Sequence, residues 1–282
     1  MLLAVDIGNT NIVIGLLGPA DEAGTRRPRP EVSKATRPII ATYRITTAAA
    51  HTSDEYGIML LQFLALSSCK PADVEGVIIS NVVPSLMHSF RAAIIKFFGL
   101  NPLVVGPGVK TGLSVRIDDP RSLGADCLVD CVAAYNLYPA PCLVIDMGTA
   151  TTFNIVDDHG AITMGLITAG LQTSAKALAG ETAQLPQVEI RKPSTILTKN
   201  TGEAIQAGLY YSFLGGLETI VKQISSEYEA QRPDSPKLTV VATGGLGRVV
   251  EEDATALGIL DAYDPDLIFK GLDIIYSKTA RY

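Results

Sequence analysis

Residues 1–17 read MLLAVDIGNTNIVIGLL, and this stretch decides the class of fold. Apolar, β-forming residues fill Leu2–Ile7 and Ile12–Leu17, which are two runs of strand length. Between them stands Gly8-Asn9-Thr10-Asn11, a run of residues that favours a tight turn. The pattern predicts a β-hairpin that carries an acidic residue, Asp6, where its first strand ends.

The same arrangement returns near the middle of the chain. Cys142–Ile145 is a short aliphatic run, Asp146-Met147-Gly148-Thr149-Ala150 follows it, and Thr152–Val156 is a second strand-like run. In both copies an aspartate after an aliphatic strand is followed by an apolar residue, a glycine and an Asn or Thr. An opening motif that restarts at the midpoint indicates two similar domains, which we expect at 1–140 and 141–282.

The rest of the sequence alternates strand-like and helix-like segments, as an α/β protein does. Thr52-Ser53-Asp54-Glu55 and Asp118-Asp119-Pro120 carry helix-start signals. The Arg- and Pro-rich stretch within Gly18–Pro38 is predicted to be a solvated loop. In one predicted helix a single apolar face is expected, formed by Leu209, Phe213, Leu217 and Ile220. The other strands are expected over 41–46, 74–81, 103–105 and 238–242, and the helices over 53–66, 84–98, 120–138, 173–179, 202–228 and 267–278.

The composition is that of a globular protein, with 47% hydrophobic and 18% charged residues. Lys and Arg number 23 against 29 Asp and Glu, and this net charge of −6 argues against a general nucleic-acid binder, which needs a basic face. No apolar run approaches the about 18 residues of a membrane span, so no membrane partner is expected. The N-terminus lacks a signal peptide's basic start, and the four cysteines form no CxxC pair. We therefore expect reduced thiols and a cytoplasmic location.

The two Asp-x-Gly turns are the first candidates for chemistry. A glycine after a strand lets backbone amides approach a phosphate closely, and the neighbouring hydroxyls and amides add neutral donors. The aspartates cannot bind phosphate themselves, so they are expected to hold a cation or its waters. One such turn alone is more often an ordinary hairpin, whereas two matched copies favour a nucleotide site.

Two further motifs carry weaker signals. Gly244-Gly245 ends a predicted strand, where it either lies against a nucleotide's base or ribose or forms a tight turn. Asp126 lies near a predicted helix start, where it either takes a proton from a substrate hydroxyl or stabilises the helix dipole. Common alternatives are missing from the sequence, because Gly106–Thr111 has valine where a P-loop needs glycine before its lysine. Neither a Gly-x-Ser-x-Gly elbow nor a His-Glu-x-x-His helix occurs.

As a set, the motifs resemble those of the type III pantothenate kinases, members of the sugar kinase, heat-shock chaperone and actin superfamily. The resemblance covers essentially the whole chain. It implies an α/β fold of two similar domains of the actin-like or ribonuclease H-like type, each a mixed β-sheet flanked by helices, with the active site in the cleft between them. The matching motifs, in family order, are Asp6–Asn11, Asn81–Pro84, Gly124–Asp126, Asp146–Thr152, Lys199–Thr201 and Ala242–Gly245.

The resemblance implies an activity as well: transfer of the γ-phosphate of ATP to the hydroxyl of pantothenate, the first step of coenzyme A biosynthesis. Asp126 would be the general base, and Asp146 would bind a monovalent cation, K⁺ or NH₄⁺. Asp6 would lie near the Mg²⁺ that accompanies ATP, and the chain would form a homodimer. The implied ATP-binding residues are Asp6, Ile7, Gly8, Asn9, Thr10, Asn11, Ile12, Val13 and Thr149. The implied pantothenate-binding residues are Gly124, Ala125, Asp126, Cys127 and Thr201, the last from the facing subunit or a nearby loop.

The chain departs from the family pattern at Cys127. Relatives have arginine there, in Gly-x-Asp-Arg, and arginine is the natural partner for the carboxylate of pantothenate. A thiol offers neither the charge nor the forked donors. A smaller departure is Leu166–Gly170, where relatives usually show proline before the glycine. Two alternatives therefore stay open: a catalytically weakened paralogue acting as a regulatory protein, and a kinase for another small hydroxyl compound that lacks a carboxylate.

Overall fold

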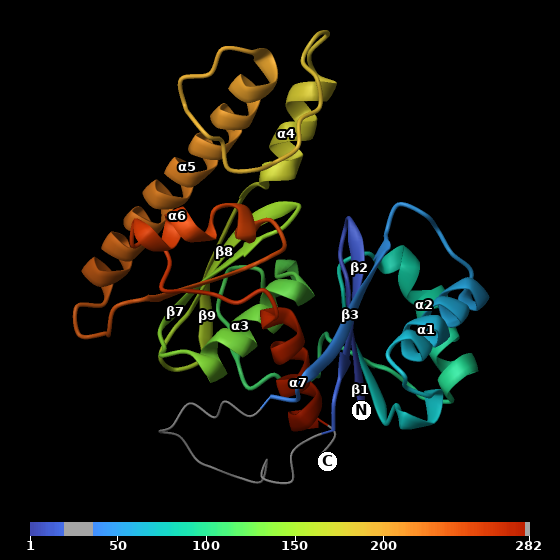
Figure 1. Cartoon of the computed structure of the whole chain (residues 1–282). Coiled ribbons are helices and arrows are strands. Elements are labelled where there is room, and N and C mark those ends of the chain that lie inside the picture. Colours follow the sequence, from blue (N-terminus) through green and yellow to red (C-terminus); the bar gives the residue numbers. More distant parts are fainter. Residues whose placement is uncertain (20–35, 280–282) are drawn as a thin grey trace. The chain divides into compact units, whose positions relative to one another are not determined.

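A computed structural model describes residues 1–19 and 36–279 of the chain (Figure 1). Within these residues the chain divides into two compact units, each built on its own β-sheet. The first unit takes the described parts of 1–113, 121–137 and 266–279, and the second takes 114–120 and 138–265. Most of the stretch predicted as a solvated Arg- and Pro-rich loop lies outside the described residues. None of the described helices is both long enough and apolar enough to cross a membrane.

The first unit is a five-stranded mixed sheet in the order β3-β2-β1-β4-β5. Side chains alternate across β1, so Leu3, Val5 and Ile7 pack with α1 and α2 on one face. Leu2 and Ala4 pack with α3 and α7 on the other face. Because both faces are covered, β1 is almost entirely apolar up to Asp6. The elements are β1 (Leu2–Ile7), β2 (Asn11–Leu17), β3 (Ile39–Thr46), α1 (Ser53–Leu66), a 3₁₀ turn (Pro71–Asp73), β4 (Gly76–Asn81), α2 (Pro84–Phe98), β5 (Leu103–Val104), a 3₁₀ turn (Pro120–Ser122), α3 (Ala125–Leu137) and α7 (Leu267–Thr279).

The second unit is a six-stranded mixed sheet in the order β11-β10-β7-β8-β9-β6. One face of its central strands packs against the long helix α5 and the short helix α6, with Leu143, Ile145 and Phe153 in the shared core (Figure 1). The elements are β6 (Ser114–Val115), β7 (Cys142–Met147), β8 (Ala150–Val156), β9 (Ala161–Ala169), α4 (Leu171–Gly180), α5 (Thr201–Gln231), β10 (Thr239–Thr243), a 3₁₀ turn (Gly247–Val249), α6 (Glu251–Ala256) and β11 (Ala262–Tyr263).

The two sheets repeat one topology. In the first sheet β1 pairs antiparallel with β2, β2 antiparallel with β3, and β1 parallel with β4. In the second sheet β7 pairs antiparallel with β8, β8 antiparallel with β9, and β7 parallel with β10. Even the irregularities match: the register shifts at Leu16/Leu17 between β2 and β3, and at Ile155/Val156 between β8 and β9. The burial patterns of β1 and β7 are identical, and so are those of β2 and β8. The predicted α/β fold with two similar, helix-flanked mixed sheets is confirmed.

The last helix of the chain, α7, does not belong to the unit in which the predicted domain boundaries put it. The predicted domains 1–140 and 141–282 are continuous in sequence, whereas α7 belongs to the first unit. The reason is packing, because Phe269, Leu272 and Ile275 of α7 share a buried core with β1, β4 and α3. Strongly apolar faces pack where a partner surface exists, whatever their position in the chain.

Two helices differ from their predicted form. The helix expected from Pro120 begins only at Ala125, after the 3₁₀ turn at Pro120–Ser122. Its first-turn hydrogen bond runs from the Leu128 N–H to the Gly124 carbonyl at 3.1 Å. The apolar face of helix α5 is wider than predicted. Tyr210, Leu214, Leu217, Val221 and Tyr228 are buried in the core, and Phe213 and Ile220 of the predicted face are partly buried against it.

The predicted face of α5 also lines an apolar groove of about 670 Å³ within the second unit. The opposite side of the groove is formed by the end of β9, by α4 and by Leu185. Ile167, on β9 directly before this lining, is 74% exposed. The α5 residues that line the groove are Thr201, Ala204, Ile205, Gly208, Leu209, Ser212, Phe213, Gly216, Leu217 and Ile220.

Candidate active site

The first Asp-x-Gly turn joins β1 to β2 at the end of the first sheet. Asp6 is paired with Val13 across the hairpin and with Ser80 of β4. The Gly8 N–H donates to the Asn11 carbonyl at 3.0 Å, which closes the turn. All the predicted ATP-binding residues of the first half therefore lie in one hairpin end: Asp6, Ile7, Gly8, Asn9, Thr10, Asn11, Ile12 and Val13. Among them, Asn9 and Thr10 are exposed.

Thr47, the residue that follows β3, supports this turn. Its Oγ1 donates to the Gly8 carbonyl at 2.8 Å, and its N–H donates to the Thr10 carbonyl at 3.0 Å. Two carbonyl groups of the turn thus accept hydrogen bonds from a single residue. Because carbonyl oxygens repel anions, their engagement leaves a turn better suited to a phosphate.

The second turn has the same construction in the other unit. Asp146 is paired with Thr152 of β8 and Thr243 of β10, and the Gly148 N–H donates to the Ala150 carbonyl at 3.1 Å. Its support comes from residues after β9, the counterpart of β3 in this sheet. The Thr149 carbonyl accepts from the Gly170 N–H at 3.1 Å and from Thr173 Oγ1 at 2.6 Å.

Gly244 lies directly against the carboxylate of Asp146. Its φ is +93°, in the left-handed region that favours glycine, and a Cβ there would stand 2.5 Å from Asp146 Oδ1. The predicted glycine pair therefore forms a tight turn whose first residue packs on the second acidic turn. Any side chain at position 244 would displace the Asp146 carboxylate or the backbone beside it.

Asp126 lies in the first turn of α3 and is half-buried. Its Oδ1 accepts a hydrogen bond from the Cys127 N–H at 2.7 Å. A Cβ at Gly124 would stand 2.3 Å from the same oxygen, so the glycine makes room for this carboxylate. The Gly124-Ala125-Asp126 motif thus has a local structural explanation. Gly124 directly precedes the helix, and because it has no side chain the Asp126 carboxylate can lie against it.

Thr201 is the first residue of α5 and is exposed. Asn200 caps the helix by accepting from the Glu203 N–H at 2.9 Å. The segment 181–200 that leads to Thr201 contains no regular element. Connections of this length without secondary structure are uncommon and are usually functional.

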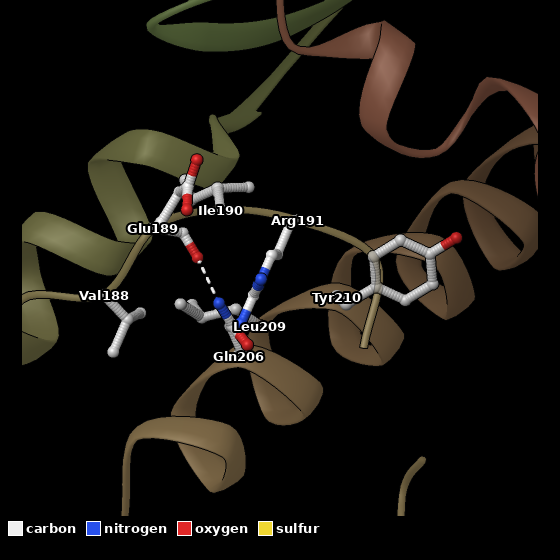
Figure 2. A pocket seen from close by; sticks show the side chains of 7 residues that line it. All are labelled: Val188, Glu189, Ile190, Arg191, Gln206, Leu209 and Tyr210. Carbon is white, nitrogen blue, oxygen red and sulfur yellow. Dashed lines mark hydrogen bonds between the residues drawn. The ribbon is translucent and has the colours of Figure 1, made fainter. Parts of the chain in front are cut away.

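Residues 188–191 of this segment lie along α5, as Figure 2 shows. Gln206 Nε2 donates to the Glu189 carbonyl at 2.7 Å. Just beyond, Lys192 Nζ donates to Asp253 of α6 at 2.7 Å, and the Tyr210 hydroxyl donates to the same carboxylate at 2.5 Å. Burial, followed by the hydrogen bond to Asp253, raises the pKa of Tyr210. The segment is therefore anchored to both α5 and α6 before it reaches Thr201.

The structure distributes the predicted site residues over both units. The hairpin end Asp6–Val13 and the motif Gly124–Cys127 belong to the first unit. Asp146, Thr149 and Thr201 belong to the second. No group of three or more His, Cys, Asp or Glu that could hold a metal occurs within 1–19 and 36–279.

Three supporting residues carry no motif signal of their own. Thr47, Thr173 and Tyr263 each donate a hydroxyl hydrogen bond to a backbone carbonyl of one of the glycine turns. Their side chains are common ones at unremarkable positions in the sequence. The internal duplication could have indicated the first two. Thr47 follows β3 and Thr173 follows β9, the equivalent strand of the second sheet, so the duplication relates Thr47 to the Gly170–Thr173 region.

Comparison with known proteins agrees with this arrangement. The family model for type III pantothenate kinase matches residues 2–223. Among curated relatives, the type III pantothenate kinase of Bifidobacterium longum subsp. infantis is 54% identical over 281 residues, covering 100% of both chains. That of Agathobacter rectalis is 41% identical, covering 100% of this chain and 98% of the relative.

Solved structures show the likeness of fold. A protein described as a Baf family transcriptional activator from Campylobacter jejuni aligns with a TM-score of 0.56 at 18% identity, covering 99% of this chain and 100% of that one. The activator of 2-hydroxyisocaproyl-CoA dehydratase from Clostridium difficile, with bound ADPNP, aligns with a TM-score of 0.51 at 12% identity, covering 99% and 96%. The family match and the full-length identities decide the assignment: the chain belongs to the type III pantothenate kinase family.

Proposed function

We propose that the chain phosphorylates pantothenate with ATP, giving 4′-phosphopantothenate for coenzyme A biosynthesis. The observation that carries the proposal is the matched pair of acidic glycine turns, Asp6–Asn11 and Asp146–Ala150, at equivalent ends of two equivalent sheets. This combination suits a phosphotransferase, because amides bind phosphate oxygens while carboxylates hold the cations that offset their charge. Family membership supplies the acceptor, pantothenate.

In this proposal the first turn binds the phosphates of ATP. The N–H groups of residues 9–11 and the hydroxyl of Thr10 would contact phosphate oxygens, and Asp6 would lie near the Mg²⁺. The fit is a chemical one, since Mg²⁺ on a nucleotide takes most of its ligands from phosphates and water and needs only one or two protein carboxylates. Thr149 of the second turn would contact ATP as well.

Asp146 is the proposed ligand for a monovalent cation. Its carboxylate is half-buried at a strand end, beside the backbone of Gly244 and the turn 148–150. Potassium is coordinated by oxygen atoms, and ammonium donates hydrogen bonds to them, so carboxylate and carbonyl oxygens fit either ion. A cation there would lower the repulsion between Asp146 and the phosphates of ATP.

Asp126 is the proposed general base. As the pantothenate hydroxyl oxygen attacks the γ-phosphorus, its proton passes to the Asp126 carboxylate, and the bond from phosphorus to the ADP oxygen breaks. Supporting this role, the carboxylate is fixed through Oδ1 by the Cys127 N–H and by the space that Gly124 provides. A base held in one orientation loses little entropy in the transition state.

A homodimer is part of the proposal, with a second copy of the chain covering the apolar groove of α5. Ile167 and Leu178 are exposed beside a groove that is mainly apolar, and such surfaces are characteristic of protein interfaces. Sedimentation should report a dimer for the parent and a folded monomer for Phe213→Glu, which puts a charge into the groove. Tyr211→Glu, on the same helix but outside the groove lining, should remain a dimer. A monomeric parent, or a folded dimeric Phe213→Glu, would contradict this part.

The compartment proposed is the cytoplasm. Among the described residues, no disulfide joins any of Cys69, Cys127, Cys131 and Cys142. Reduced cysteines suit a reducing compartment.

The test of the proposal is acceptor-dependent release of ADP by the purified chain. Pantothenate should stimulate release, and pantothenol, the same molecule with an alcohol in place of the carboxylate, should stimulate it less. Equal or better use of pantothenol would favour a kinase for a carboxylate-free acceptor. ATP binding without any acceptor-dependent release would favour the regulatory alternative.

A further inference from the structure

Tyr263 contacts the turn 244–247, which packs on the Asp146 turn, from a short edge strand. It is the last residue of β11, and its hydroxyl donates to the Gly244 carbonyl at 2.8 Å. The Gly247 N–H donates to that same carbonyl oxygen at 3.1 Å. Both acceptor sites of the Gly244 carbonyl are therefore used, and its orientation is fixed.

The position of Gly244 in turn limits the position of Asp146. A Cβ on Gly244 would stand 2.5 Å from Asp146 Oδ1 and 2.6 Å from the Met147 nitrogen. No side chain or water fits between these backbones, so they rest on each other directly. A shift of Gly244 by a few tenths of an ångström would be felt at the Asp146 carboxylate.

The Tyr263 ring holds the rest of the glycine turn as well. A Cβ at Gly247 would stand 2.4 Å from Cε2 of the ring, so the ring lies against the turn's backbone. Burial raises the pKa of Tyr263, so its hydroxyl remains a donor throughout the neutral and mildly alkaline range. Ring and hydroxyl together fix both ends of the segment 244–247.

We propose that Tyr263 is a positioning residue for nucleotide binding, acting on Asp146 through Gly244. In this role it acts through the backbone of Gly244 rather than by a contact of its own with ATP or the acceptor. Its hydroxyl holds the Gly244 turn against the Asp146 carboxylate and so keeps the second turn in its binding geometry. This inference rests on the proposed function, in which Asp146 and Thr149 serve ATP and its cation.

The first test is Tyr263→Phe, which removes the hydroxyl and keeps the ring. Calorimetry with ATP, Mg²⁺ and K⁺ should give about 3- to 10-fold weaker nucleotide binding, the effect of one lost hydrogen bond. The KM for ATP should rise by a similar factor, with the KM for pantothenate unchanged. Tyr228→Phe is the matched control, because the hydroxyl of Tyr228 bonds to Ser235, away from both turns. Unchanged ATP affinity in a folded Tyr263→Phe would overturn the inference.

The second test asks whether the effect passes through Asp146. In a double-mutant cycle with Asp146→Asn, Tyr263→Phe should add less than 2-fold to the loss of nucleotide affinity, because the carboxylate that it positions is gone. Fully additive losses would show that Tyr263 acts elsewhere and would overturn the route. These measurements need only nucleotide, so a parent that binds ATP but phosphorylates no pantothenate would sink the proposed function and leave this inference standing. A parent that binds no ATP would overturn both.

Discussion

Asp126 owes its orientation to the two residues beside it. The Cys127 N–H holds one carboxylate oxygen, and Gly124 provides the space in which that oxygen lies. If this carboxylate takes the hydroxyl proton, Asp126→Asn should lower kcat by about 10²- to 10⁴-fold, because the amide cannot accept it. The affinity for ATP should stay near that of the parent. Steady-state kinetics check this, with Asp118→Asn, an exposed carboxylate on the approach to α3, as the control. A kcat within threefold of the parent would remove Asp126 from the mechanism.

The thiol at Cys127 leads to a prediction about the KM for pantothenate. The carboxylate of pantothenate loses hydration in a pocket, and a charged hydrogen bond that compensates for this is worth about 1.5–3 kcal/mol. Cys127→Arg should therefore lower the KM for pantothenate at least tenfold and leave the KM for ATP alone. Cys127→Ala should bring no such gain, which separates the guanidinium's effect from loss of the thiol. If Arg116 or Arg121, both exposed, already serves the carboxylate, its change to Ala should raise that KM instead. No change in all three would place acceptor recognition outside this segment.

Residues differed in how far the sequence could predict them. Asp6, Gly8, Asp146 and Gly148 were predictable because strand, turn and acid are consecutive in sequence. Tyr263 and Thr47 were not, since their part in the turns depends on contacts that the chain makes over long separations. The roles of Gly124 and Gly244 could be seen only in the structure, because they depend on which atoms occupy the space of the missing Cβ.

Among elements, the turn between β8 and β9 gives a prediction for stability. Asp157 is buried there and accepts from the Ala161 N–H at 2.8 Å, the His159 N–H at 3.0 Å and Arg232 at 3.1 Å. Burial alone would raise the pKa of Asp157, but these donors outweigh it and lower the pKa. A lowered pKa contributes stability above the carboxyl's unfolded value, about 4, which is lost as the pH falls through the folded value.

The parent's free energy of unfolding should therefore decrease as the pH is lowered below about 4. Asp157→Asn should cost about 1–3 kcal/mol at pH 7, because it weakens a buried, charge-assisted set of hydrogen bonds. It should also flatten the acid part of the pH dependence. Urea unfolding at several pH values measures both, with the exposed Asp234→Asn as the control. An acid slope identical to the parent's would show that Asp157 does not contribute to it.

The predictability of elements followed their length and periodicity. The hairpin of β1 and β2 and helices α1, α2 and α7 were close to their predicted bounds because apolar period and caps agree. β6 and β11 are two residues long and exist only through their partner strands. The apolar face of α5, a helix of 31 residues, is wider than predicted because Tyr210, Leu214 and Val221 are buried in the same core as Leu217.

At the scale of the molecule, the duplicated turns give a prediction about ions. If Asp146 holds a monovalent cation beside ATP, potassium or ammonium should support faster turnover than sodium. Asp146→Asn should remove the preference, because its amide carries no charge for the cation. Initial rates with each chloride as the sole monovalent salt, at constant ionic strength, provide the measurement. Equal rates in all three salts would leave Asp146 with a turn-forming role only.

If this pair of turns acts with Asp126, the whole molecule moves a phosphoryl group from ATP to pantothenate. Mass spectrometry of pantothenate incubated with the purified chain, ATP, Mg²⁺ and K⁺ measures this transfer. Pantothenate should gain one phosphoryl group on its hydroxyl as ADP accumulates in equal amount, and Asp126→Asn should nearly abolish the product. A parent that binds ATP yet leaves pantothenate unmodified would show that the chain is not a pantothenate kinase.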